Sequence, residues 1–239
     1  IVIATGIEHA SLPDGLYGFG RFENVITNLH FERLMNAGGP TAGQIVRPSD
    51  GAHARRIGWI QCAGRGLVRG LPYCSKVCCM IAAKQTIIAK EHDGSVEAVV
   101  FYNDLKAYGK SFWSFYQKAV ESGVRYVRAR PWDVSEDARS KDMRIRYENL
   151  DTGLPEEETV DLLVLSAGLV PAGGNRRLAK TLGIELDDLG FFKEPDPVRK
   201  PLASGQDGIY LCGGATGPID ISESVVQASA AAMMAVTGR

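Results

Sequence analysis

Cysteine is scarce in this sequence, with five among 239 residues. Four of the five fall close together, as Cys62, Cys74, Cys78 and Cys79. A disulfide-stapled secreted fold carries more cysteines in a shorter chain, whereas a reducing compartment leaves thiols free for metal binding or redox chemistry. The scarcity therefore disfavours a disulfide framework, and the grouping favours a metal or redox site.

An excess of one charge is also missing. The sequence has 27 Lys and Arg against 28 Asp and Glu, a formal net charge of -1, so composition gives no sign of nucleic acid or a membrane surface as partner. Its apolar runs, such as Leu162–Leu165 and Ala228–Val236, fall short of the roughly 20 residues of a bilayer span. No basic-then-apolar leader opens the chain. We expect a cytoplasmic, globular protein that is long enough for two domains.

Strand-like apolar runs alternate with helical patterns along the chain. The strands are expected at Ile57–Ile60, Val99–Tyr102, Val124–Val127, Leu162–Leu165 and Ile209–Cys212, and the helices at about Cys78–Lys90, Ser111–Ser122 and Ser222–Val236. Arg144–Leu165 differs, because alternating side chains and a turn at Asp151–Gly153 predict a β-hairpin. The alternation of strand and helix predicts an α/β protein built on parallel sheets.

A complete glycine fingerprint is missing as well. A dinucleotide-binding fold places a GxGxxG turn after its first strand to hold a pyrophosphate. Here Ile57–Ile60 is followed by Cys62-Ala63-Gly64-Arg65-Gly66, which lacks the last glycine. Gly64 and Gly66 could still bind phosphate, but the cysteines would then need another explanation. We expect this domain to keep the fold, to lose NAD(P)H, and to pass electrons through metal.

Four thiolates are the ligand set of an iron–sulfur cluster. Adjacent side chains diverge, so Cys78 and Cys79 are expected at the start of a helix, where both can turn toward a cluster and the amides stabilise negative charge. A 4Fe-4S cluster on Cys62, Cys74, Cys78 and Cys79 is one interpretation of this ligand set. Structural zinc, a redox disulfide or buried free thiols are the alternatives. Cys212 lies in an apolar strand and is expected in the core.

Several motifs resemble those of known flavoproteins. They are Ile1–Gly6, Asn24–Asn28, Phe31–Leu34, Ile45–Gly51, Ile60–Cys62, Tyr73–Met80, Asp161–Gly168, Gly208–Gly214 and Gly217–Ser224. Their order resembles the two-dinucleotide-binding-domain, thioredoxin-reductase-like flavoprotein reductases. Within that group the sequence is most similar to the flavin and iron–sulfur A subunit of heterodisulfide reductase and its relatives in quinone-interacting oxidoreductase complexes.

The resemblance implies a division into domains. Residues 1–50 and 170–239 would form the FAD-binding domain, and residues 51–169 an inserted, degenerate pyridine-nucleotide domain that carries the cysteines. The amino-terminal strand and GxGxxG turn that hold the FAD pyrophosphate in the family are missing, so a longer subunit is expected. No Cys-x-x-Cys-x-x-Cys run follows residue 79, so onward electron transfer would need another polypeptide or region.

The resemblance also implies site residues. Lys84 would lie near the flavin N5, and Glu32 would face the isoalloxazine ring; solvated helix residues are the alternative for both. The implied FAD contacts are Thr5, Gly6, Gly213, Gly214, Gly217, Pro218 and Ile219. The alternative for the glycine segment is a strand-to-helix turn without a ligand. Ser222 is expected as the N-cap of the next helix.

The function implied by the resemblance is electron transfer, with electron bifurcation possible in this family. FAD would accept an electron pair, and the 4Fe-4S cluster would pass electrons to other subunits of a disulfide-reducing, hydrogenase or quinone-interacting complex, or to ferredoxin. The alternative is a non-redox scaffold or assembly subunit in which a structural metal or thiols hold a docking surface. Iron and flavin content distinguishes the two.

Overall fold

The computed structural model describes residues 1–66 and 70–237, which form two compact units. Unit 1 comprises Ile1–Ala10, Ser75–Val77 and Leu169–Arg239, and unit 2 comprises Ser11–Cys74 and Cys78–Gly168. Residues 1–50, expected in one domain, are thus distributed over both units. The loop Ala63–Tyr73, which connects Cys62 to Cys74, includes residues 67–69, which lie outside the described residues.

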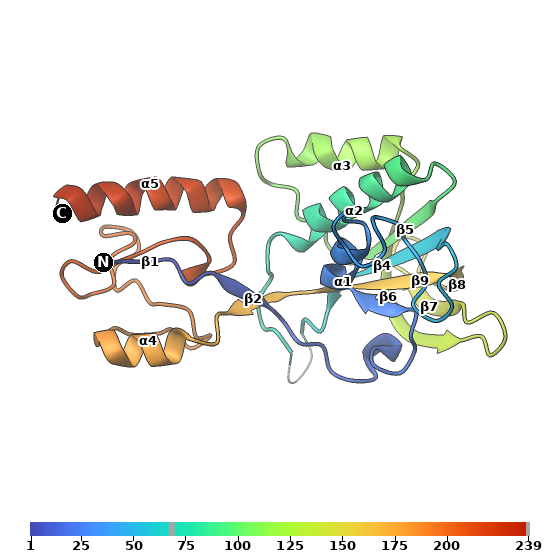
Figure 1. Cartoon of the computed structure of the whole chain (residues 1–239), viewed down its shortest axis with the longest axis horizontal. Helices are drawn as coiled ribbons and strands as arrows, with labels where there is room; N and C mark the ends of the chain where they lie inside the picture. Colours follow the sequence, from blue (N-terminus) through green and yellow to red (C-terminus); the bar gives the residue numbers. More distant parts are fainter. Residues whose placement is uncertain (67–69, 238–239) are drawn as a thin grey trace. The chain divides into compact units, whose positions relative to one another are not determined.

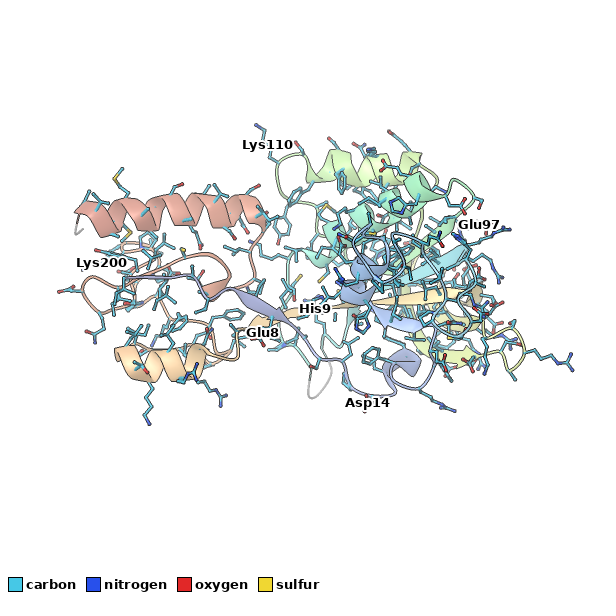
Figure 2. All side chains as sticks on the ribbon, in the orientation of Figure 1. Glu8, His9, Asp14, Glu97, Lys110 and Lys200 are labelled. Carbon is cyan, nitrogen blue, oxygen red and sulfur yellow. The ribbon has the colours of Figure 1, made fainter. Side chains whose placement is uncertain are left out.

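Unit 2 is built on a seven-stranded sheet with the strand order β3-β9-β4-β5-β6-β7-β8. The strands are β3 (Val25–Thr27), β4 (Arg56–Ala63), β5 (Glu97–Tyr102, its first residue labelled in Figure 2), β6 (Arg125–Glu136), β7 (Met143–Asn149), β8 (Leu154–Val160) and β9 (Leu162–Ala167). The first five in this order run parallel, and β6, β7 and β8 pair antiparallel. The expected parallel sheet and hairpin are both confirmed.

Central strands of this sheet are buried on both faces, which explains their continuous apolar runs. Ile57 and Trp59 of β4 and Val164 of β9 pack on the face that carries the helices. Ile60 and Leu165 pack on the other face, in a second core. The sheet therefore separates two apolar cores within unit 2.

The helices of unit 2 are α1 (Asn28–Leu34), α2 (Cys78–His92) and α3 (Phe112–Glu121), with a short 3-10 turn η1 (Leu16–Gly18). Figure 1 shows α2 and α3 on the same side of the sheet. Small residues Ala82, Ala83 and Ala89 are fully buried in α2, so the helix backbone packs closely on the sheet. The expected helix start at Cys78 is confirmed.

Unit 1 contains two pairs of short strands. Strand β1 (Val2–Ile3) pairs parallel with β11 (Tyr210–Leu211), and β2 (Ile7–His9) pairs antiparallel with β10 (Leu169–Pro171). Helices α4 (Asn175–Leu182) and α5 (Ile221–Thr237) flank β1 in Figure 1, and the 3-10 turn η2 (Gly213–Ala215) follows β11. Glu8, labelled in Figure 2, accepts a hydrogen bond at Oε1 from the Gly173 amide at 2.9 Å.

Within residues 1–66 and 70–237, every helix is too short or too polar to serve as a membrane span.

Candidate functional site

The four clustered cysteines lie in unit 2, around the carboxyl end of β4 and the start of α2. Cys62 occupies an irregularity in the pairing of β4 with β9 and has a left-handed backbone, with φ of 57°. Cys78 and Cys79 are the first two residues of α2, and Cys74 lies in the loop before it. A left-handed conformation is costly for a residue with a side chain and is often retained at functional sites. The bulge at Cys62 therefore marks this strand end as a site of specialised geometry.

The adjacent pair of cysteines contacts two different segments. The Cys78 thiol donates to the carbonyl oxygen of Ala167 at the end of β9, at 3.6 Å. Cys79 Sγ accepts from the Lys106 amide, at 3.4 Å, in the loop after β5. Since neighbouring side chains diverge, Cys78 faces β9 and Cys79 faces the β5 loop. The two side chains therefore contact the carboxyl edge of the sheet at two places, the end of β9 and the loop after β5.

Burial raises the pKa of Cys78 to about 12 and that of Cys79 to about 11. Negative charge on Cys62 or Cys74 raises both pKa values further, so all four sulfur atoms lie within reach of one another's fields. Burial also raises the pKa of Cys62, while the neighbouring Arg65 opposes that shift. Without a metal these three thiols are therefore protonated at neutral pH, and metal binding would release protons.

The donor set can be tested for its fit to a metal group. Among the described residues, no three His, Cys, Asp or Glu side chains stand close enough to hold one metal ion. A 4Fe-4S cluster binds each of its four thiolates at a different iron, so its ligands do not have to converge on a single point. Four electrostatically coupled thiols are the soft donor set that iron–sulfur clusters take. The chemistry of these residues fits a cluster.

Lys84 and Glu32, expected near a flavin, are brought together in unit 2. The Lys84 ammonium of α2 forms an ion pair with Oε1 of Glu32 in α1. Their side chains are 41% and 37% exposed, so water screens the pair. Glu32 thus has Lys84 as a direct ion-pair partner, and the pair orients the Lys84 side chain toward α1.

A buried glutamine that the sequence analysis did not identify supports this pair. Gln85 is fully buried and donates from Nε2 to Glu32 Oε2 at 3.1 Å and to the Asn28 carbonyl at 2.8 Å. Its Oε1 accepts from Trp59 Nε1 at 3.1 Å. The available signal was a polar side chain among the alanines on the buried face of a helix, where a satisfied network is expected.

The expected FAD contacts lie in unit 1, at the carboxyl ends of β1 and β11. Because these two strands are parallel, Thr5 and Gly6 after β1 lie beside Gly213 and Gly214 after β11. The Thr5 hydroxyl donates to Asn175 Oδ1 at 2.9 Å. Gly6 and Gly213 have φ values of 72° and 68°, a conformation that favours glycine. A glycine-lined strand edge of this kind fits a ligand that approaches the backbone closely.

Packing alone accounts for the glycine at position 214. A Cβ atom there would lie 2.9 Å from Ile7 Cγ2 and 3.3 Å from the carbonyl carbon of Gly6. Gly217 differs, since a Cβ at that position would meet open space. Pro218 and Ile219 follow in the link to α5 and are partly buried. The absence of a side chain at Gly214 thus lets the segment after β11 pack against Gly6 and Ile7, whereas the space beside Gly217 is open.

The start of α5 is capped by Asp220, and the expected N-cap Ser222 is wrong. The Glu223 amide donates to Asp220 Oδ1 at 2.8 Å, and the Asp220 amide donates to Glu223 Oε2 at 3.1 Å. This reciprocal pair is a capping box, with the helix starting one residue before Ser222. The Lys76 ammonium pairs with Glu223 Oε1 at 2.6 Å and lowers the pKa of that carboxyl.

Comparisons with curated proteins show similarity along nearly the whole chain. The sequence is 45% identical over 236 residues to the iron–sulfur A subunit of the CoB–CoM heterodisulfide reductase of Methanocaldococcus jannaschii, covering 97% of this chain and 36% of that protein. It is 40% identical over 238 residues to the A subunit of the H2:CoB–CoM heterodisulfide,ferredoxin reductase of Methanothermobacter thermautotrophicus, covering 98% and 36%. The chain spans about a third of the length of these relatives. No family model matches the sequence.

Solved structures show the fold. The thioredoxin reductase of Lactococcus lactis has a TM-score of 0.58 at 17% identity, with 99% of this chain and 65% of that chain covered. The thioredoxin reductase of T. acidophilum has a TM-score of 0.57 at 15% identity, with 99% and 64% covered. The expected thioredoxin-reductase-like α/β fold with two dinucleotide-binding domains is confirmed.

Proposed function

Because the chain belongs to the family of heterodisulfide reductase A subunits, we propose that it forms the FAD- and iron–sulfur-dependent electron-transfer part of such a protein. The single observation that carries this proposal is the placement of the cysteines at the carboxyl edge of the parallel sheet, where Cys62 lies in β4 and Cys78, at the start of α2, contacts the carbonyl of Ala167 in β9. In open α/β sheets that edge is where ligands bind. Here the edge presents sulfur ligands, as an iron–sulfur cluster requires.

In this proposal Cys62, Cys74, Cys78 and Cys79 hold a 4Fe-4S cluster. A bound cluster supplies one-electron transfer. The amino terminus of α2 favours the negative charge that such a group brings, because its backbone amides point toward the first residues of the helix. The buried thiols of Cys78 and Cys79 give up their protons on ligation, which makes assembly depend on pH.

The FAD contacts in this proposal are Thr5, Gly6, Gly213, Gly214, Gly217, Pro218 and Ile219. Bound FAD supplies two-electron acceptance. Lys84 would place a cation that favours a reduced, anionic ring, and Glu32 would fix the direction of Lys84 through their ion pair. Gln85 holds Glu32 from the buried side. Lys84 and Glu32 are thus the proposed catalytic residues, and Gln85 positions them.

The proposed partners are other subunits of an electron-transfer complex. The relatives are named for H2, ferredoxin and a CoB–CoM heterodisulfide. We therefore propose that this chain works with a disulfide-reducing, hydrogenase or quinone-interacting subunit, with ferredoxin as a further partner; electron transfer with or without bifurcation fits this proposal. A protein nucleophile is not needed for such transfer.

Anaerobic purification of the full-length subunit tests the proposal through iron, acid-labile sulfide and flavin content. We expect Cys78→Ser to remove about four irons per chain relative to the wild type. The matched control is Cys212→Ala, since Cys212 is a cysteine of unit 1 buried beside Leu202 and Tyr210, as the sequence predicted. Cys212→Ala should leave the iron content unchanged.

Two results would contradict the proposal. A colourless, iron-free wild-type protein prepared without oxygen would favour the non-redox scaffold. About one zinc per chain that Cys78→Ser removes would favour a structural metal.

A further inference from the structure

A row of polar side chains crosses three neighbouring strands of unit 2 near their carboxyl ends. Thr27 of β3 and Ile60 of β4 both pair with Leu165 of β9, which lies between them. The residues that follow these three are Asn28, Gln61 and Ser166. Their exposed fractions are 3%, 7% and 1%, so the row is buried.

Ser166 lies on the helix-bearing face of the sheet. Side chains alternate along a strand, and Val164, two residues earlier, packs in the core that contains α2, whereas Leu165 and Ala167 pack in the other core. Gln61 lies opposite Ser166, at the irregularity where residues 61 and 62 of β4 face a single residue of β9. The helix begins at Cys78 at this edge of the sheet, since the Cys78 thiol contacts the carbonyl of Ala167.

The hydrogen-bonding capacity of this row is largely unused. Gln61 Nε2, Gln61 Oε1 and Ser166 Oγ are buried and have no hydrogen-bond partner in the described chain. Asn28 Oδ1, by contrast, accepts from the Ala167 amide at 3.2 Å. The other buried glutamine nearby, Gln85, has partners for both its amide atoms. An unpaired buried amide costs more than an apolar side chain, so its presence calls for a partner from outside the chain.

Both orphaned side chains adjoin the cysteine site. Gln61 directly precedes Cys62, and Ser166 directly precedes Ala167, whose carbonyl oxygen accepts from Cys78. The amide and the hydroxyl are hydrogen-bond donors, and the sulfur atoms of a cluster are acceptors. The reduced form of a cluster carries more negative charge, so donors to its sulfurs stabilise that form.

We propose that Gln61 and Ser166 are positioning residues that donate hydrogen bonds to sulfur atoms of the iron–sulfur cluster and raise its reduction potential. The inference rests on the proposed function, since it needs the cluster that the four cysteines would hold. A water molecule shared by the two side chains is the competing explanation, because buried water commonly satisfies orphaned polar groups. The two explanations differ in what they predict for the potential.

The test uses Gln61→Leu and Ser166→Ala in the full-length subunit prepared without oxygen. Each variant should move the midpoint potential of the cluster, measured by redox titration with electron paramagnetic resonance, to a more negative value, and the double variant should move it further. In cluster-free protein each single variant should keep or increase the denaturation midpoint, because an unpaired polar group has been removed. A purely structural residue would lower stability in both forms and leave the potential unchanged.

Ser49→Ala is the matched control. Its hydroxyl is also buried and has no partner among residues 1–66 and 70–237, and its amide donates to Asn24 Oδ1, at the opposite end of β3 from Asn28. It should leave the potential unchanged. Unchanged potentials in both test variants at full iron content would overturn the inference and favour bound water. If Gln61→Leu prevents folding, Ser166→Ala decides alone. A wild type without iron would instead overturn the proposed function.

Discussion

Gln85 is the buried side chain whose removal should be most costly near the Lys84–Glu32 pair. It satisfies Trp59, Asn28 and Glu32 at once. Gln85→Ala would leave the Trp59 indole N–H unpaired and open a cavity in the core, so we expect a loss of about 2–4 kcal/mol in the free energy of unfolding. Urea unfolding followed by tryptophan fluorescence measures this.

Lys84→Ala is the control for Gln85→Ala, because Lys84 directly precedes Gln85 in the sequence but its ion pair is water-exposed. It should cost less than about 1 kcal/mol. Equal losses in the two variants would contradict the network in which Gln85, and not Lys84, carries the stability of this region. The same pair of variants also separates structural from electronic effects, since only Lys84→Ala should change flavin chemistry without changing the fold.

At the scale of residues, the sequence identified four cysteines as a candidate site but not the groups around them. Thiols have a distinctive donor chemistry, so the grouping of Cys62, Cys74, Cys78 and Cys79 indicates a metal or redox site, and the family resemblance adds the iron–sulfur cluster. Gln61 and Ser166 carry no such signal, because their importance comes from a register between strands that are more than a hundred residues apart in sequence. Pairings of that kind, including Lys76 with Glu223, cannot be derived from local periodicity.

At the scale of elements, the packing of β2 against the turn η2 depends on Gly214. The Cβ of Gly214→Ala would come within 2.9 Å of Ile7 Cγ2, closer than carbon atoms tolerate. We expect a loss of about 1–3 kcal/mol in the free energy of unfolding of unit 1. Thermal unfolding of the single variant, of Ile7→Ala and of the double variant forms the test.

Ile7→Ala removes the atoms that clash with the new Cβ of Gly214→Ala. The double variant should therefore lose less unfolding free energy than the two single variants lose in total. Strict additivity would show that Gly214 is not constrained by Ile7. Gly6→Ala provides a contrast, since its Cβ would meet nothing within 4 Å and its cost would come from the positive φ alone.

The amino terminus of α5 should respond to acid. Lys76 lowers the pKa of Glu223 in the folded protein, so the pair stabilises the fold fully above the unfolded pKa of the carboxyl, ordinarily 4.5. That stability is lost as pH falls through the depressed folded pKa. Because both side chains are partly exposed, we expect only about 0.2–1 kcal/mol.

The measurement for α5 is the difference in unfolding free energy between wild type and Lys76→Met from pH 7 to pH 3. The difference should shrink as pH falls below 4.5, since a protonated Glu223 no longer attracts Lys76. Ser222→Ala, at the position wrongly expected to be the cap, should show no pH-dependent difference. A difference in unfolding free energy between wild type and Lys76→Met that grows in acid would contradict the lowered pKa of Glu223 in the folded protein.

Elements with a strong local pattern were predictable, and those defined by long-range pairing were not. The apolar runs of β4 and β9 and the turn at Asp151–Gly153 were identified because buried strands and turns each have a characteristic pattern within a short stretch of sequence. Strand β6 extends to Glu136, well beyond the expected Val124–Val127, because an irregularity at Pro131–Asp133 lets it continue into the hairpin. Strand β11 lies within the expected strand Ile209–Cys212, whereas β2 and β10, with three residues each, are too short for a periodic signal.

At the scale of the whole molecule, the two units are unequal in their continuity along the chain. All seven strands of the large sheet and helices α1, α2 and α3 lie within residues 11–168. Only the short segment Ser75–Val77 interrupts this stretch by belonging to unit 1, where the Leu169 amide donates to the Ser75 hydroxyl at 2.8 Å. Unit 2 is therefore nearly continuous along the chain and has its own cores, as a domain that can fold by itself does.

A fragment of residues 11–168 tests that independence together with the assignment of the cofactors. We expect cooperative unfolding in urea and retention of the iron that Cys78→Ser removes, because the four cysteines and both cores lie inside the fragment. Flavin should be lost, since Thr5, Gly6 and the segment from Gly213 to Ile219 lie in unit 1. Far-UV circular dichroism, iron analysis and flavin fluorescence measure the three properties. A folded fragment that cannot hold iron would show that unit 1 supplies a part of the cluster site, whereas a fragment that keeps flavin would remove the glycine edge of β1 and β11 from the FAD site.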